Sequence, residues 1–555
     1  MTAKAATIEV TDTDIAANTN VVWTADNEYI LNGLVFVDPG ASLTIQPGTV
    51  IKGKPGQGEN SSALVVARGG KIFASGTAEA PIIFTAEADD VNDPTDLPLD
   101  TRGLWGGVII LGNASLNSEP GETPIEGIPT TESRGIYGGN DDADNSGVFR
   151  YVSIRYGGTD IGAGNEINGL TMGGVGTGTV IEYVEVYNNK DDGFEWFGGT
   201  VNTKYLVSAF NGDDAFDYDE GFRGKGQFWF VIQDDETGNR AGEHDGGTSP
   251  EDGTPYATPA IYNATYIGSG EFSVNGDNDT VLEIRDNAGG HYINSIFTDF
   301  ANEGIDVEDL DSGEDSRARL EAGDLKLANN IWWGFGAGNE LAAIAPDDFV
   351  AEHLAANENR IVDPMLNGIS RDPDGGLDPR PMVGGAAYSG LASTPDDGFY
   401  TAVDYVGAFG SRLWTQGWTF LSEAGITTFD GSTPTVVAEE STLAGMPSAF
   451  ALSQNHPNPF NPSTNISYSL ASSGYVSLKV YDLLGQQVAT LVEGNRLAGS
   501  YQVRLDAADL SSGMYFYQLH IKWNHFLCPK NLIKCFPLLR HHKQQFSYFF
   551  FLHFQ

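Results

Sequence analysis

The sequence predicts an all-β protein in which a long solenoid of short stacked strands is followed by a small β-sandwich. Apolar and β-branched runs of three or four residues alternate with turns that carry Gly or Pro over about residues 30–335. Runs of similar pattern recur at intervals of roughly 22–32 residues, which suits one solenoid coil each. Near the C-terminus, alternating apolar and polar residues indicate half-buried strands of a separate module.

The solenoid is expected to occupy residues 30–335, after an N-terminal cap or lead-in over residues 1–29. Its first strands are expected at 34–37, 43–45, 50–51 and 64–66, between turns rich in Gly and Pro. Further along, 149–154 parallels 181–186, and 204–208 parallels 228–232. A single coil cannot bury its apolar face alone, so stacking must build one continuous core.

Three asparagines recur at similar places in the later coils, namely Asn263, Asn294 and Asn329. Asn tolerates unusual turn geometry and its amide satisfies backbone groups. We interpret the three as a ladder that stabilises the turns rather than as ligands.

Residues 336–430 are less regular and are predicted to form the C-terminal cap of the solenoid. One or two short helices are expected within 340–357. Residues 403–409 and 414–418 are expected to pack on the last coil, because a solenoid needs its open end covered. Residues 431–448, rich in Ser, Thr, Pro and Glu, are predicted to be a linker.

Two stretches of the first coils carry a family resemblance: Pro-Gly-Thr-Val-Ile-Lys at 47–52 and Ala-Pro-Ile-Ile-Phe-Thr at 80–85. With the repeated short strands, they make the chain similar to right-handed parallel β-helix proteins of the pectate-lyase-like superfamily. Such stretches are common in the first coils of its secreted bacterial members. The resemblance implies a parallel β-helix fold.

The β-sandwich is predicted over residues 449–520. Ile466, Tyr468 and Leu470 alternate with polar residues, and 476–480 repeats the pattern, as expected for an Ig-like sandwich. The segment also holds ordered motifs: Pro457, Asn458, Pro459, Phe460, Asn461 and Pro462, then Tyr481, Asp482, Gly485 and Gly513.

These motifs resemble the C-terminal sorting domain of proteins exported by the type IX secretion system of Bacteroidota and related bacteria. The resemblance implies the secretion machinery as a partner and a location outside the cell or on the outer-membrane surface. An ordinary Ig-like module without a sorting role is the alternative that the strand pattern alone allows.

The two ends of the chain depart from this picture. Residues 521–555 contain no Asp or Glu and hold both cysteines, Cys528 and Cys535. We interpret this aberrant basic tail as a frameshifted ending, which would impair sorting, and the alternative is a genuine basic appendage. The first residues lack the pattern of a signal peptide. The apolar run 546–554 is too short to span a bilayer, so no transmembrane segment is predicted.

The net charge of −45 arises from 75 acidic and 30 basic residues. Binding to nucleic acid is not expected, because phosphate recognition requires basic clusters. Abundant carboxylates suit divalent cations, and simple solubility is the alternative explanation.

Two acidic-aromatic segments, 188–197 and 211–222, follow each other at the spacing of one coil. Stacking would bring together six carboxylates, which we interpret as a candidate calcium site: Asp191, Asp192, Glu195, Asp213, Asp214 and Asp217. The alternative is solvated turn carboxylates chosen for turn geometry. A third acidic patch covers 302–315.

A non-catalytic binding, adhesive or structural role is favoured. Exposed tryptophans would bind a glycan by stacking, but core or ladder packing is favoured for any one of Trp196, Trp229, Trp332 and Trp333. The other function considered is an extracellular polysaccharide-degrading enzyme, a lyase or a glycoside hydrolase. Lyases of this fold combine calcium with a basic Arg or Lys, for which Arg285 is a candidate, although pairing with Glu283 or Asp286 explains it more simply. His244 is predicted to lie in a surface loop.

Overall fold

The computed structural model describes two units, which cover residues Met1–Phe429 and Asp430–Gln555 and are treated separately. The described residues are 6–160, 167–428, 439–443, 450–456, 458, 463–471, 474–482, 487–496, 499–506, 513–523 and 544–554.

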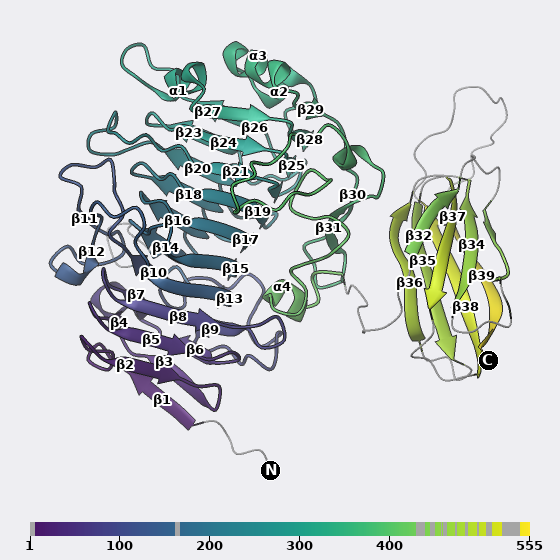
Figure 1. Cartoon of the computed structure of the whole chain (residues 1–555), viewed down its shortest axis with the longest axis horizontal. Coiled ribbons are helices and arrows are strands. Elements are labelled where there is room, and N and C mark those ends of the chain that lie inside the picture. The colour runs from purple at the N-terminus through teal and green to yellow at the C-terminus, as the bar shows by residue number, and fades with distance from the viewer. Residues whose placement is uncertain are drawn as a thin grey trace. The chain divides into compact units, whose positions relative to one another are not determined.

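The first unit is a parallel β-helix, as predicted, whose strands stack into three parallel faces (Figure 1). Face 1 contains nine described strands in spatial sequence, each hydrogen-bonded to the next. They are β4 (Leu34–Val37), β7 (Ala63–Val66), β10 (Val108–Leu111), β14 (Leu170–Gly173), β16 (Phe194–Phe197), β18 (Phe216–Asp219), β20 (Gly242–Asp245), β23 (Thr280–Arg285) and β26 (Glu303–Val307).

In the first and last coils, faces 2 and 3 are formed by separate short strands. Face 2 includes β2 (Asn20–Trp23), β5 (Ser42–Ile45), β8 (Lys71–Ser75), β21 (Ala260–Tyr262), β24 (Gly290–Ile293) and β27 (Leu325–Ala328). Face 3 includes β1 (Ala6–Val10), β3 (Asn27–Leu31), β6 (Val50–Gly53), β9 (Ile82–Ala86), β22 (Thr265–Ile267), β25 (Ile296–Phe300), β28 (Ile331–Phe335) and β29 (Arg360–Ile361).

In the middle of the solenoid, four longer strands cross from face 2 to face 3 without a break: β13 (Gly147–Arg155), β15 (Val180–Tyr187), β17 (Asn202–Ala209) and β19 (Lys225–Ile232). Each bends at an aromatic residue with positive φ. The sequence predicted shorter strands there, because periodicity does not reveal a bend within a continuous run.

These bends form a ladder that continues along the corner between faces 2 and 3. Tyr151, Tyr183 and Tyr205 stack with ring centroids 4.4 Å and 4.2 Å apart. In later coils Asn263, Asn294 and Asn329 take the corner position, with φ values of 56° to 58°. Asn adopts this left-handed conformation more readily than most residues. The predicted Asn ladder is therefore real and stabilises the corner.

Most of the four tryptophans considered above pack in the core. Trp196 and Trp229 stack at 4.9 Å inside the solenoid, and Trp332 is also fully buried. Trp333 is half-buried. The three buried tryptophans cannot stack on a glycan, because their rings fill the space between the faces. Core packing, the favoured placement, is confirmed for them.

A long segment, residues 389–423, runs back along the corner ladder and is called the strap (Figure 1). It begins beside the last coils, where Asn329 Nδ2 donates to Gly390 O at 3.0 Å. It ends with α4 (Phe420–Glu423), after Trp418 has packed edge-on against Tyr151 and Tyr183. The expectation that 414–418 pack on the last coil is therefore wrong, because the rings of Trp414 and Trp418 cover the flank of earlier coils. Residues 403–409 do reach the last coils, where Val406 packs with Ile296 and Ile331.

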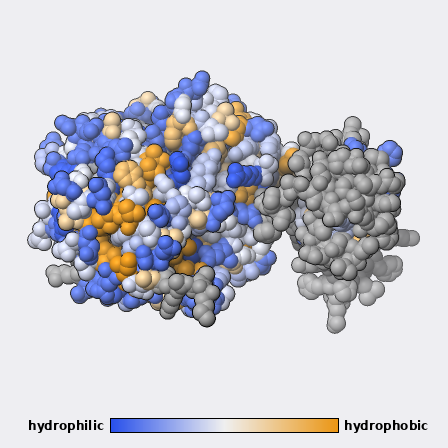
Figure 2. All heavy atoms as spheres, turned by 60° about the horizontal axis from the view of Figure 1, so that its bottom comes forward, coloured by the Kyte–Doolittle hydropathy of each residue, from blue (hydrophilic) through white to orange (hydrophobic). Residues whose placement is uncertain are grey.

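The two ends of the solenoid differ. The predicted short helices are present as α2 (Leu341–Ile344) and α3 (Asp348–Ala356), which lie beside the last coil and bury Ile344, Val350 and Leu354. The N-terminal coil instead leaves Ile8 and Val22 exposed by 39% and 53%. Figure 2, in which this end is turned forward, shows a limited apolar patch within a largely hydrophilic surface.

The remaining elements of the first unit are short. They are β11 (Thr123–Pro124), β12 (Ile136–Tyr137), β30 (Leu366–Ile369), β31 (Leu377–Pro381), α1 (Ser316–Ala322), and 3₁₀ turns at Gly58–Asn60, Ser133–Gly135 and Ala386–Tyr388. Among them, β11 and β12 belong to a loop that covers the outer side of face 1. Ile125 and Tyr137 of this loop pack with Ile109, Leu111 and half-buried Phe197.

The second unit contains two four-stranded antiparallel sheets. One sheet has the order β32-β37-β34-β33 and the other β36-β35-β38-β39. The strands are β32 (Glu439–Leu443), β33 (Ala451–Leu452), β34 (Ser463–Leu470), β35 (Gly474–Asp482), β36 (Gln487–Arg496), β37 (Gly499–Asp506), β38 (Gly513–Trp523) and β39 (Gln544–Phe554). Ile466, Val480 and Tyr517 lie in its buried core. The predicted sandwich is confirmed.

Some of the predicted sorting motifs lie on these strands. Tyr481 and Asp482 end β35, Gly513 begins β38, and the Tyr481 ring stacks on Phe516 at 5.2 Å. Asn458 is exposed. The other motif residues lie outside the described part of the chain: Pro457, Pro459, Phe460, Asn461, Pro462 and Gly485.

The segments predicted as linker and tail each contribute a strand. β32, within the predicted linker, pairs antiparallel with β37. β39, within the predicted basic tail, pairs with β38 over its full length, from Gln544↔Trp523 to Phe554↔Gly513. Residues 524–543 of the tail lie outside the described residues. Part of the atypical ending thus forms the edge strand β39 of this sheet.

Candidate metal centre

The turns that lead into β16 and β18 are held by stacked asparagines. The Asn189 N–H donates to Asn211 Oδ1 at 2.8 Å, and Asn189 Nδ2 donates to Asp192 O at the same distance. Both asparagines are buried. A Cβ on Gly193 would lie 2.6 Å from Asn211 Nδ2, so glycine is needed where the turns approach. The Asn–Asp–Gly composition is therefore what brings neighbouring turns into contact.

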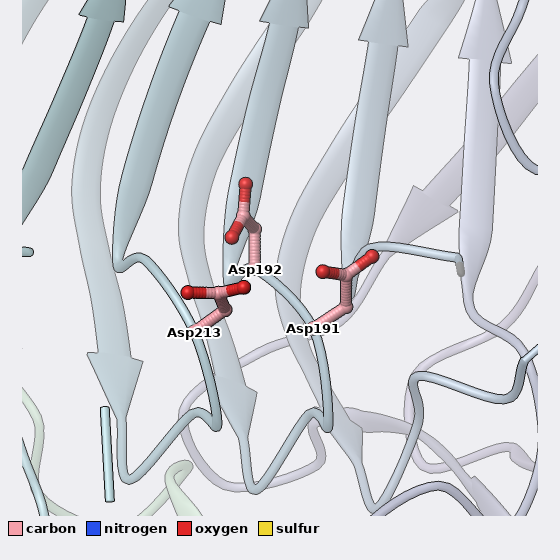
Figure 3. Close-up of side chains that lie close together, drawn as sticks. All are labelled: Asp191, Asp192 and Asp213. Carbon is pink, nitrogen blue, oxygen red and sulfur yellow. The ribbon is translucent and has the colours of Figure 1, made fainter. Parts of the chain in front are cut away.

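Carboxylates from two successive coils meet above these turns. Oxygen atoms of Asp191, Asp192 and Asp213 lie within 4.8 Å of one another (Figure 3). A second triad with the same spacing consists of Asp192, Glu195 and Asp217, so Asp192 belongs to both. Glu195 on β16 and Asp217 on β18 are direct partners in the strand register. The structure therefore brings together five of the six carboxylates that the sequence singled out.

The spacing fits a calcium ion. Calcium binds six to eight oxygens at 2.3–2.6 Å, so ligand oxygens around one ion lie up to about 5 Å apart. Asp192, Glu195 and Asp217 are 8%, 6% and 9% exposed. The Asp217 Oδ1 atom is buried and has no hydrogen-bond partner. A buried carboxylate oxygen without a donor is costly unless a cation satisfies it.

The electrostatics of the cluster point the same way. Burial raises the pKa of Asp192 well above its usual range, and neighbouring Asp214 and Asp191 raise it further. Burial likewise raises the pKa of Glu195 and of Asp217. Asp192 raises the pKa of Glu195 further, and Glu195 raises that of Asp217. Like charges that share a dry site destabilise one another, and a divalent cation removes that repulsion.

Asp214, the sixth predicted ligand, has a different environment. Its Oδ1 accepts a hydrogen bond from the Arg240 N–H at 2.5 Å, and its own N–H donates to Asp192 Oδ1 at 2.9 Å. Asp214 is 2% exposed and lies outside both triads. Its contacts connect the turn to the next coil, so its hydrogen bonds give it a role in the fold.

The acidic cluster continues as a row of carboxylates along the outer side of face 1. The strand register aligns one carboxylate per coil: Glu195, Asp217, Glu243, Glu283 and Asp306. We call these five residues the acid row. Sequence reasoning placed only its first two members together, and assigned Asp306 to the separate acidic patch 302–315. The other members could have been found from an acid at the same outward position of each face 1 strand. That position can be recognised only when the register of the strands is known.

Arginines accompany the far part of the acid row. Arg285 lies 2.7 Å from Asp245, 3.0 Å from Glu243 and 3.2 Å from Glu283, and Arg240 lies 2.7 Å from Glu283. The expected pairing of Arg285 with Glu283 is confirmed, and it extends across coils to Asp245. Burial raises the pKa of Glu243 to about 7.

Two further expectations are corrected. His244 is fully buried on β20, where its ring stacks on Tyr218 with centroids 3.9 Å apart. It faces the core because its neighbours Glu243 and Asp245 occupy the outward positions of the strand. The acidic patch 302–315 does not gather in one place. Glu308 joins Glu251 and Asp286, whereas Asp309 pairs with Arg317 at 2.6 Å.

Family comparisons agree with both modules. A model described as a pectate-lyase-like beta helix domain matches residues 15–345, and a secretion system C-terminal sorting domain matches residues 455–533. No curated protein matches the chain. The sorting domain identifies a type IX secretion cargo that is released or held at the cell surface, with the secretion machinery as its partner.

Among the described helices, none combines the length and the apolar character needed to cross a bilayer. The β-helix match covers more than half of the 555 residues and coincides with the three stacked faces. The chain therefore belongs to the pectate-lyase-like β-helix family.

Proposed function

We propose that this secreted β-helix protein has a non-catalytic binding, adhesive or structural role, and that calcium bound at the Asp192 cluster stabilises it. The observation that supports calcium is the meeting of two carboxylate triads at Asp192, with Asp217 Oδ1 buried and without a hydrogen-bond donor. Asp191, Asp192, Asp213, Glu195 and Asp217 are the proposed ligands. Calcium would join the turns of two successive coils and so strengthen their stacking.

Calorimetric titration of the chelator-treated full chain with calcium tests the metal site. We expect saturable binding that is at least tenfold weaker in Asp217→Asn, because this change removes a ligand charge while retaining the side-chain shape. Asp311→Asn is the matched control, since Asp311 is exposed and lies outside the triads. Equal calcium affinity in Asp217→Asn and the control would contradict the proposed site.

The double substitution Asp213→Ala with Asp214→Ala is a less specific test. If only the metal site were affected, stability would fall only in the presence of calcium. Asp214 also accepts the Arg240 N–H, however, and that bond is lost with or without metal. Asp213→Ala alone separates the two effects, because Asp213 is half-buried, belongs to a triad and does not take part in the Arg240 hydrogen bond.

For a glycan partner, the strap offers an aromatic ring where the buried tryptophans do not. Phe399 is half-buried and lines a cavity of about 300 Å³ together with Thr177, Asn202 and Glu182. A ring beside hydroxyl, amide and carboxylate groups suits a sugar. Retention on immobilised polysaccharides that is lost in Phe399→Ala would support this form of the proposal.

The second candidate function is an extracellular polysaccharide-degrading enzyme. It is favoured by Arg285, which is 38% exposed and adjoins the acid row near the proposed calcium ligands. The full chain would be incubated with acidic and neutral polysaccharides, with calcium or chelator, while new reducing ends are measured. Calcium-dependent release that is lost in Arg285→Gln would favour the enzyme. No release on any substrate would favour the non-catalytic role.

A further inference from the structure

A second cavity lies where three segments of the β-helix unit meet. Its volume is about 440 Å³. One wall comes from the long loop between β9 and β10, another from the residues that follow β17 and β19, and the third from the turn between β30 and β31. The volume lies within the range of pockets that hold small molecules.

Part of the lining of this cavity is apolar, and we call this part the floor. Leu99, Phe210 and Ile369 line it, and Leu99 is one of the few large hydrophobic side chains of the unit that are exposed, at 37%. An apolar side chain left open inside a cavity gains from contact with a hydrocarbon group.

Another part of the lining is acidic, and its negative charge is not balanced; we call this part the rim. Asp100, Asp235 and Asp372 line the cavity, are exposed and form no ion pair within the described part of the chain. The arginines nearby are already engaged: Arg371 with Asp299 at 2.9 Å, and Arg102 with Asp234 at 3.3 Å.

The arrangement differs from a metal site. The three rim carboxylates are not among the groups whose oxygens come within 4.8 Å of one another. A divalent metal would also gain nothing from an apolar floor, since calcium and magnesium bind oxygen. Separated carboxylates above a hydrocarbon surface instead match a ligand that has both a positive group and an apolar stem.

We propose that this cavity binds a small organic amine, with its ammonium groups among Asp100, Asp235 and Asp372 and its methylene stem on Leu99, Phe210 and Ile369. The assignment is independent of calcium binding. It gives the solenoid a cation-selective site that distinguishes amines from both metal ions and neutral alcohols, because the rim and the floor each contribute.

Ligand-observed NMR and calorimetry on the chelator-treated full chain test the proposal, with 1,5-diaminopentane as the probe. We expect saturable one-to-one binding, at least tenfold tighter than that of 1,5-pentanediol, which has the same stem without charge. Calcium chloride at equal ionic strength should not displace the diamine. Displacement by calcium, or equal binding of the diol, would contradict the proposal.

Variants separate the rim from the floor. Asp100→Asn with Asp235→Asn should weaken diamine binding at least tenfold. The matched control, Asp252→Asn with Asp311→Asn, makes the same change in net charge at exposed positions outside the cavity and should bind normally. Leu99→Ser should weaken diaminopentane more than 1,3-diaminopropane. Equal weakening by the rim and control variants would show general charge attraction and would overturn the assignment.

Discussion

The strap side and the outer side of face 1 both bury carboxylates, but in opposite environments. Glu185 on β15 is fully buried and accepts hydrogen bonds from Ser153 Oγ at 2.6 Å and from the N–H groups of Phe420 and Leu421 at 2.6 Å and 3.3 Å. Asp217 on β18 has an oxygen with no donor and has other carboxylates as neighbours.

The pKa directions express this difference. Burial raises the pKa of both groups, but the Arg155, Ser153 and backbone neighbours of Glu185 lower it, whereas Glu195 and Asp245 raise the pKa of Asp217 further. The donors of the fold thus satisfy Glu185, whereas Asp217 has acidic neighbours and one oxygen without a hydrogen-bond donor. A buried acid with donors is part of the fold, and a buried acid among acids points to a ligand.

The largest expected effect comes from removing the satisfied carboxylate. Glu185→Ala should lower the free energy of unfolding by about 3–5 kcal/mol, because two backbone donors and Arg155 lose a buried partner. Denaturant unfolding with calcium or chelator measures it, and the loss should be the same in both. Glu423→Gln should cost much less, since that side chain is 32% exposed. A calcium-dependent loss in Glu185→Ala would show that Glu185 acts with the metal site rather than with the strap alone.

The pH dependence of stability tests a buried base in the core behind the acid row. His244 lies on the same strand as Glu243 but faces inward, and burial lowers its pKa to about 3. Above about pH 6.5 both folded and unfolded states hold it neutral. As the pH falls from there towards 3, only the unfolded state takes up the proton, so stability is lost.

At pH 4 the expected cost of His244 is about 3 kcal/mol. The free energy of unfolding is measured for the wild type and for His244→Phe at pH 7 and pH 4, with chelator present. The loss of stability between the two pH values in the wild type, minus the loss in the variant, gives the cost of His244. The acidic groups titrate alike in the two proteins and cancel. A double difference near zero would mean that His244 becomes protonated within the fold.

Substitution of Asp217 should change stability in opposite directions with chelator and with calcium. In chelator, Asp217→Asn should stabilise the protein by about 1–3 kcal/mol, because it relieves repulsion from Glu195. With millimolar calcium the wild type should gain stability and the variant should not, so the order reverses. Thermal unfolding under the two conditions measures it. If Asp217→Asn destabilised the protein equally with chelator and with calcium, Asp217 would be a structural acid like Glu185.

Sequence reasoning predicted the repeated coils and five of the clustered acids because both follow from local patterns. Asp191, Asp192 and Glu195 share a turn and strand, and one coil spacing relates them to Asp213 and Asp217. It did not connect Glu243, Glu283 or Asp306 with these acids, because the intervening loops vary in length and hide the register.

The strap shows a second limit. Trp414 and Trp418 were assigned to the end of the solenoid, yet they pack on Tyr183 and Tyr205 in its middle. The sequence contains the aromatic rings on both sides, but nothing local states that residues 389–423 turn back along the coils. Contacts across more than two hundred residues depend on the path of the chain, which periodicity does not describe.

The smallest expected effect tests how the strap holds the later coils. Asn294 Nδ2 donates to Ala392 O at 2.8 Å, and its Oδ1 accepts from the Ala392 N–H at 2.9 Å. Asn294→Gly keeps the positive φ of 57° without strain and removes only these bonds, so about 1 kcal/mol should be lost. Asn294→Ala should lose about 1 kcal/mol more, because alanine is strained in that conformation.

Hydrogen exchange at the Ala392 amide provides the local measurement for this pair. If the Asn corner ladder holds the strap, exchange at the Ala392 amide should accelerate in both variants. The amide of Phe420, which donates its hydrogen bond to Glu185, should keep its protection. Protection lost together at both amides would mean that the strap opens as one unit. Calcium should change neither rate, because the strap contacts involve none of the proposed ligands, and this independence is what distinguishes the two sides of the solenoid.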